Sequence, residues 1–186
     1  MKKAEIISSI LAVLASVGNL YLVPGSEAVL VTSLSTLGIL YIFGGMSGFQ
    51  VNLKAEASFE NQMTQFIYKI GGYSMAVFAI GVLFYQLFWP GHKAMIIAGF
   101  SSCILSLGFL LFKKKEVKSE DVRKLFPRLF AWVFLGGLFV FLPQQKWVAI
   151  KYKNHPSVVE SFERMQKAPK NDSLKDLFQK SKKEIE

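Results

Sequence analysis

Long apolar runs separated by short polar segments dominate the first 143 residues of the chain. Four of these runs, over residues 6–23, 28–49, 66–89 and 94–112, carry no charge near their centres. Each is close to the ~20 residues that a helix needs to cross about 30 Å of hydrocarbon. The pattern therefore predicts four transmembrane helices.

A fifth apolar run is shorter and begins directly after Arg128. Residues 129–142 are all apolar, and extension back to Leu125 places Pro127 in the first helical turn, where its missing N–H is tolerated. The Arg128 side chain would then reach toward the lipid headgroups along its long stem. We predict a fifth span over residues 125–143, with a re-entrant or interfacial segment as the alternative.

Two similar turns join the first four runs in pairs. Pro24-Gly25-Ser26-Glu27 lies between the first and second, and Pro90-Gly91-His92-Lys93, preceded by Trp89, lies between the third and fourth. An offset of 66 residues superimposes these turns and also aligns Ala28 with Ala94, Ser35 with Ser101 and Phe43 with Phe109. The pattern predicts two helical hairpins and favours a duplication, in which both copies have the same orientation.

The chain after residue 143 is polar and reads as two short amphipathic helices. Pro156 opens the first, and Asp172-Ser173, with Asp176 in a capping box, opens the second. Helices this short need a surface to pack on, which is each other, the membrane or a partner. The side chains expected to face a partner are Phe162, Met165, Leu177 and Phe178.

The predicted fold class is an all-α polytopic membrane protein with two tandem hairpins, a fifth transmembrane helix and a short helical tail. The expected divisions are a first hairpin (1–49), a cytoplasmic loop (50–65), a second hairpin (66–112), a basic cytoplasmic loop (113–124), the fifth helix (125–143) and the amphipathic tail (144–186).

Composition and charge agree with a membrane location. Hydrophobic residues make up 52% of the 186 and charged residues 19%, whereas a soluble domain has about a quarter charged. The net charge of +9 comes from bases beside the apolar runs, and no nucleic-acid-binding signature is present. The apolar run after Lys2-Lys3 could also be a secretory signal, but Glu5 and the recurrence of such runs favour a span.

The distribution of bases predicts the orientation. We expect the protein to lie in a cell inner membrane, and the positive-inside bias then places the N-terminus in the cytoplasm. The same bias places a basic run on the cytoplasmic side, where we expect it to contact lipid headgroups. That run is Lys113, Lys114 and Lys115. Five spans then put the tail in the periplasm, whereas four would leave it in the cytoplasm.

The sequence holds few groups for chemistry. Cys103 is the single cysteine, His92 and His155 have no acidic residue at metal-ligand spacing, and no nucleophile or phosphate-loop motif occurs. We therefore expect no cofactor, no metal and no enzymatic activity. Small and hydroxyl residues within the runs are expected to pack helices together. The candidates are Gly44, Gly48, Ser101 and Ser102.

One segment resembles a known family. Gly81-Val82-Leu83-Phe84, followed by Trp89-Pro90-Gly91 and an apolar run with a central Gly99, is similar to the transmembrane hairpin of GldL, the gliding-motility and type IX secretion motor subunit of Bacteroidota. The resemblance covers residues 80–112. It implies a helical hairpin that assembles with partner subunits.

The resemblance does not extend to the motor residues. In that family an acid in the second helix, with a basic residue and a histidine in the first, is believed to couple proton flow to rotation. The first-helix positions correspond to Tyr85 and Phe88, and residues 93–112 contain no acid. An ion relay in a membrane needs a group that takes up and releases charge, so the family's activity is not expected here.

Two functional hypotheses follow. The first is a non-enzymatic inner-membrane subunit that assembles with other membrane proteins or with copies of itself, with a link to gliding motility or type IX secretion through the resemblance. The alternative is a small carrier or binder of lipid or another apolar ligand, held between the hairpins. In both, the lipid bilayer is a partner and nucleic acid is not.

Overall fold

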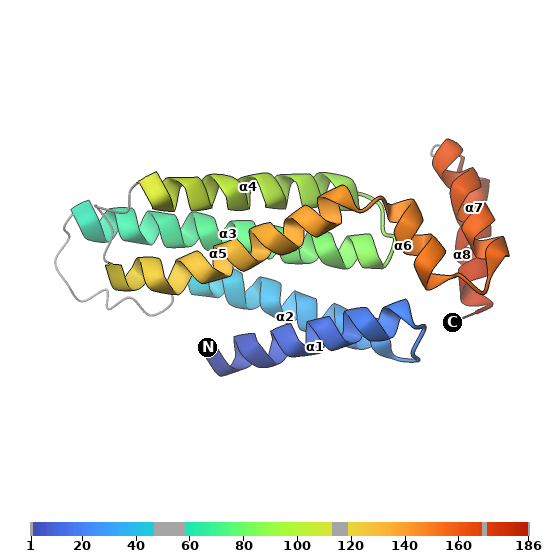
Figure 1. Cartoon of the computed structure of the whole chain (residues 1–186), viewed down its shortest axis with the longest axis horizontal. Coiled ribbons are helices and arrows are strands. Elements are labelled where there is room, and N and C mark those ends of the chain that lie inside the picture. Colours follow the sequence, from blue (N-terminus) through green and yellow to red (C-terminus); the bar gives the residue numbers. More distant parts are fainter. Residues whose placement is uncertain (1, 47–58, 113–118, 169–170, 186) are drawn as a thin grey trace.

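A computed structural model describes residues 2–46, 59–112, 119–168 and 171–185 (Figure 1). These residues form eight helices: α1 (Lys2–Leu20), α2 (Ser26–Met46), α3 (Phe59–Gln86), α4 (His92–Phe112), α5 (Ser119–Phe141), α6 (Gln144–Lys151), α7 (Pro156–Lys167) and α8 (Asp172–Lys183). Gly48 and the run from Lys113 to Lys115 lie outside the described residues, so the predictions on them stay predictions.

The five long helices form a bundle around α3. Helix α1 packs on α2, α2 on α3 and α3 on α4, while α5 lies against α4 and α3. In Figure 1 the long helices run along the same axis, with α5 drawn across α3 and α1 at the lower edge of the bundle beside α2. Most of the apolar part of α3 is buried, whereas α1 is the least buried of the four predicted spans. The all-α fold with two hairpins is confirmed.

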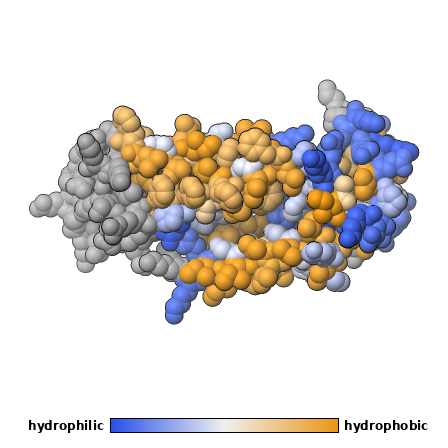
Figure 2. Space-filling view, viewed as in Figure 1, coloured by the Kyte–Doolittle hydropathy of each residue, from blue (hydrophilic) through white to orange (hydrophobic). Residues whose placement is uncertain are grey.

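Helix length and composition make the protein a multi-span membrane protein. Among the described residues, α1 to α4 are each long and apolar enough to cross a membrane. The apolar part of α5 passes the same test together with α6, from which it is separated by a bend of 84°. The bundle surface is apolar over these helices, as contact with lipid requires, whereas the surface of α7 and α8 is mostly hydrophilic (Figure 2).

The two predicted turns have the same backbone structure. Leu22 and Phe88 both adopt left-handed conformations, with φ of 57° and 58°, and Gly25 and Gly91 follow with φ of 79° and 86°. The N–H of the residue after Leu22 donates to Gly18 O at 2.9 Å, and its counterpart after Phe88 donates to Phe84 O at 2.9 Å. This bond pattern is the Schellman ending of a helix, normally built with glycine. The 66-residue offset therefore extends to matching backbone bonds.

Glycines bring α3 and α4 close together. A Cβ atom added at Gly99 would lie 2.6 Å from Phe78 Cα, and one added at Gly81 would lie 3.0 Å from Ile96 N. The serine contact between these helices joins Ser74 and Ser106, whose Oγ atoms are 3.1 Å apart.

The four residues predicted for helix packing have different environments. Ser101 is exposed, and Ser102 donates to carbonyl oxygens of its own helix because serine readily bonds the preceding turn. The close contact between α3 and α4 uses Gly99, and packing through the two serines stays a prediction. Gly44 is buried.

Helices α6 to α8 form a small unit, here called the head, at the end of the bundle that carries both turns (Figure 1). Phe88 projects from the second turn into an apolar cluster of the head with Phe162 and Phe178, at ring-centroid distances of 5.8 and 5.9 Å. Phe162 and Phe178 are each 1% exposed, so they face the bundle and each other instead of a partner. Met165 is partly buried on the same cluster, and Leu177 alone of the four predicted partner-facing residues is exposed.

The start of α8 differs by one residue from the prediction. Asn171 is the N-cap, and its Oδ1 accepts a hydrogen bond from Ser173 N at 3.1 Å. Asp172 instead accepts from Lys175 Nζ at 2.7 Å, and this bond holds the pKa of the Asp172 carboxyl below its ordinary value. Asparagine and aspartate are both good N-caps, so the sequence left the choice to the local backbone.

Candidate functional site

A groove runs along the bundle between α1 and α5. Its floor is formed by α2 and α3, and its walls by α1 and α5. Its lining is mostly apolar, and its volume is about 550 Å³. In Figure 2 it lies between the upper apolar band of α5 and the lower band of α1. The floor residues are Leu34, Leu37, Tyr41, Val82 and Gln86, and the walls include Ala12, Val13, Val17, Ala131, Trp132, Leu135 and Phe139.

The groove is elongated along the bundle. Its lining extends from Glu5 to Val17 on α1 and from Pro127 to Phe139 on α5. Twelve residues separate the ends in each helix, which corresponds to about 18 Å at the 1.5 Å rise of an α-helix. One leaflet of a bilayer is about 15 Å deep in hydrocarbon. The groove is thus about as long as one extended acyl chain in a leaflet.

Its rim is open to the surroundings of the protein. Val13 on α1 is 61% exposed and Leu135 on α5 is 40% exposed, although both line the groove. In a membrane these side chains contact hydrocarbon, so the groove opens sideways into the lipid.

An ion pair bridges the groove at the N-terminal end of the bundle. Arg128 Nε donates to Glu5 Oε1 at 2.7 Å, and Arg128 Nη2 donates to Glu5 Oε2 at 2.8 Å. The two side chains are 17% and 14% exposed, so the bidentate pair is largely removed from solvent. It ties α1 to α5 across the groove. Arg128 therefore pairs with an acid on another helix, a partner that the sequence analysis did not predict.

Aromatic rings form the groove wall next to this pair. Trp132 packs edge-on against Tyr41 and Phe78, at centroid distances of 5.8 and 5.4 Å. Tyr41 lies close enough to Glu5 and Arg128 for its hydroxyl to interact electrostatically with both charged groups. Edge-to-face packing of this kind fixes ring positions, so the wall is preformed.

The opposite end of the groove is closed by neutral groups. Gln86 Nε2 donates to Ser16 Oγ at 2.9 Å, and Ser16 Oγ donates to Ala12 O at 2.7 Å. Gln86 Oε1 is buried and has no hydrogen-bond partner among the described residues. Helix α6 contacts α1 at this end. Gln86 therefore bonds a side chain of α1.

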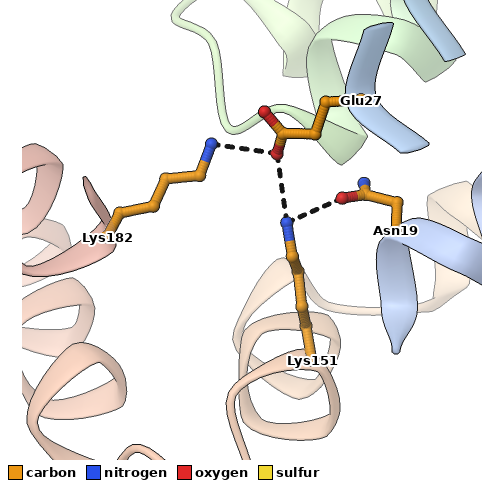
Figure 3. A network of polar contacts seen from close by, with 4 residues as sticks. All are labelled: Asn19, Glu27, Lys151 and Lys182. Carbon is orange, nitrogen blue, oxygen red and sulfur yellow. Dashed lines mark hydrogen bonds and ion pairs between the residues drawn. The ribbon is translucent and has the colours of Figure 1, made fainter. Parts of the chain in front are cut away.

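A polar network attaches the head to the first hairpin (Figure 3). Lys151 Nζ donates to Asn19 Oδ1 at 2.8 Å and to Glu27 Oε1 at 3.2 Å, and Lys182 Nζ reaches the same Glu27 oxygen at 3.1 Å. The Lys151 side chain is 1% exposed, and its Nζ also lies 5.7 Å from the centre of the Phe88 ring. The network therefore joins α6 and α8 of the head to both turns.

The groove differs from the sites that the sequence singled out. The turn residues Pro24, Gly25, Trp89, Pro90 and Gly91 and the described packing residues Gly44, Ser101 and Ser102 are not among its lining residues. The residues that sequence reasoning missed are Glu5, Arg128 and Trp132, and a weak signal was present: one acid and one base lay at the edges of apolar runs on different helices. Their 123-residue separation hid the pairing. Among the described residues, no group of three potential metal ligands comes together.

Comparison with known proteins adds no assignment to this geometry. The chain matches no protein-family model, no curated protein and no solved structure.

Proposed function

We propose that this multi-span membrane protein binds the acyl chain of a membrane lipid in the groove between α1 and α5. The observation that carries the proposal is a laterally open, apolar groove of about 550 Å³ whose length matches one leaflet. Ligand pockets typically measure about 300–1,000 Å³. The proposed role is binding and not catalysis, because the lining offers one paired acid and no nucleophile–base arrangement.

The size of the groove argues for a chain over a protein helix. A transmembrane helix about 10 Å across and 30 Å long occupies on the order of 2,000 Å³, several times the volume of the groove. An acyl chain is narrower and flexible enough to follow the lining. The Glu5–Arg128 bridge fixes the spacing of α1 and α5 at one end of the groove, and the Gln86–Ser16 bond ties α1 to α3 at the other.

The test fills the groove. Ala131→Phe on α5 adds a ring to the wall, while Ala98→Phe makes the same change on an exposed position of α4 outside the groove. The protein would be purified in mild detergent and the retained phospholipid counted per chain. We expect about one tightly held lipid in the wild type and in Ala98→Phe, and a loss in Ala131→Phe. Equal retention in all three would overturn the proposal.

A second candidate is a subunit of a larger inner-membrane assembly, as the resemblance to the GldL hairpin suggests. The supporting observation is the exposure of α1, because 22% of its span is buried. Among the described residues, α2 is the long helix on which α1 packs. Its outward face carries Ile6, Ile10 and Leu14, each more than half exposed. A crosslinker placed at Ile10 in native membranes would trap a second protein chain if this candidate is correct. It would trap lipid alone if the candidate is wrong.

The proposed topology places the N-terminus in the cytoplasm and the head in the periplasm. Support comes from the head, which packs at the end of the bundle that carries both turns. The chain reaches that end along α5, which would be the fifth crossing of the membrane. With Cys103 replaced by alanine, cysteines at Ser173 in α8 and Tyr21 in the first turn should react from the same side of the membrane. Labelling from opposite sides would exclude five spans.

A further inference from the structure

We propose that the Glu5–Arg128 end of the groove is a headgroup site that selects a phospholipid with both a phosphate and a primary ammonium group, as in phosphoethanolamine lipids. This inference rests on the proposed binding of an acyl chain in the groove. It adds the class of lipid, the end at which its headgroup lies and the residues that recognise it.

Selectivity has to come from a polar contact. A chain that moves from the bilayer into the groove passes from one hydrocarbon environment to another, so the hydrophobic effect contributes little to the choice of lipid. The groove has polar groups at both ends, but those at the turn end are neutral and lie beside α6. The N-terminal end holds the full charges, Glu5 and Arg128, with Ser9 and Tyr41 beside them on the lining. The headgroup is therefore assigned to that end.

The sign of the charges selects the headgroup. The carboxylate and the guanidinium lie side by side with no net charge, in a site where each is at most 17% exposed. A purely anionic headgroup would bind Arg128 and leave the Glu5 carboxylate without its partner. A purely cationic headgroup would bind Glu5 and leave the Arg128 guanidinium without its partner. Separating a largely buried pair in this way is costly. A zwitterion offers phosphate to Arg128 and ammonium to Glu5, so both charges stay compensated.

The type of ammonium matters as well. A carboxylate accepts hydrogen bonds, and a primary ammonium has three N–H donors. A quaternary choline group has the same charge and no N–H donor. Hydrogen bonds to charged groups contribute about 1.5–3 kcal/mol, which corresponds to a preference of about tenfold or more for ethanolamine over choline. The leaflet is the one on the N-terminal side of the bundle.

Trp132 provides the readout because it lines the groove beside the ion pair. Trp89→Phe and Trp147→Phe leave it as the single tryptophan of the three in the chain. The detergent-purified protein would be titrated with phospholipids that carry identical brominated chains, which quench Trp132 on contact. Their headgroups would be ethanolamine, its N,N-dimethyl form, choline and glycerol.

We expect quenching at the lowest concentration with ethanolamine, at a higher one with the dimethyl form, and at about tenfold higher concentrations or more with choline and glycerol. In Glu5→Gln/Arg128→Gln, which removes both charges and leaves neutral polar side chains, the chains should still quench Trp132 but with no headgroup preference. Leu14→Gln/Leu138→Gln, in which two exposed apolar residues of the same helices change outside the groove lining, should keep the preference.

The outcomes separate the two proposals. Equal quenching by all headgroups in the wild-type site, or a preference that survives in the double glutamine variant, would overturn the headgroup inference and leave the groove as a chain site. Absence of quenching by every lipid would overturn the proposed function itself. The headgroup comparison in the protein that keeps Glu5 and Arg128 tests the inference even if the double glutamine variant fails to fold.

Discussion

The two hairpins have the same turn and different helix packing. Both turns end a helix with a left-handed non-glycine residue, Leu22 or Phe88, and continue through proline and a positive-φ glycine. Yet 67% of the α3 span is buried and 22% of the α1 span. A shared turn therefore sets how the chain reverses, while the side chains along the helices set how closely the helices pack.

Small residues explain part of this difference. Gly81 and Gly99 allow backbone contact between α3 and α4. At the offset of 66 residues their counterparts in the first hairpin are Ala15 and Ser33, both buried and both with a Cβ atom. Among the described residues α2 is the long helix packed on α1, because α5 lies against α4 and α3. The looser hairpin provides one wall of the groove.

The equivalent turn residues Leu22 and Phe88 provide the largest expected contrast. Phe88→Ala removes a ring that is 7% exposed from the head cluster, and loss of such a ring costs about 3–5 kcal/mol. Leu22→Ala should cost about 1 kcal/mol, because Leu22 is only partly buried against that cluster. Amide hydrogen exchange in α7 and α8 measures head attachment. Similar exchange in the two variants would show that the head does not depend on the second turn.

A glycine comparison within α4 should give the next largest effect. Gly99→Ala places a Cβ 2.6 Å from Phe78 Cα, so backbone has to move, at about 1–3 kcal/mol. Gly108→Ala meets no atom within 4 Å and should stabilise the helix by about 0.5–1 kcal/mol. Unfolding by SDS in mixed micelles measures both. A stable Gly99→Ala protein would contradict the close crossing as the basis of the tighter hairpin.

Glu27 and Lys93, which follow the two turn glycines by two residues, should differ by the smallest amount. Glu27→Gln removes the carboxylate shared by Lys151 and Lys182, at about 1–2 kcal/mol because the Glu27 side chain is 37% exposed. Lys93→Gln changes an exposed side chain and should stay within about 0.5 kcal/mol. The same SDS titration applies. Equal effects would mean that the network in Figure 3 does not attach the head.

Much of the fold was predictable because bilayer thickness and backbone hydrogen bonding constrain it strongly. A run of about 20 apolar residues has few structures available in hydrocarbon other than a helix. The pairing of helices followed from two four-residue turns. The repeat followed from identical residues at an offset of 66 positions. The inward packing of Phe162 and Phe178 was not predictable, since an amphipathic face shows that a helix is covered without showing what covers it.

That the chain is a membrane protein of paired helices follows from the sequence, because the length and polarity of each segment decide its insertion. Tertiary structure alone decided that α5 joins the second hairpin and leaves a groove beside the first. It also brought Glu5 against Arg128 across 123 residues and Lys151 against Glu27 across 124. These contacts depend on which helices are neighbours in three dimensions, a property set by side-chain packing along whole helix faces and not readable from any one segment.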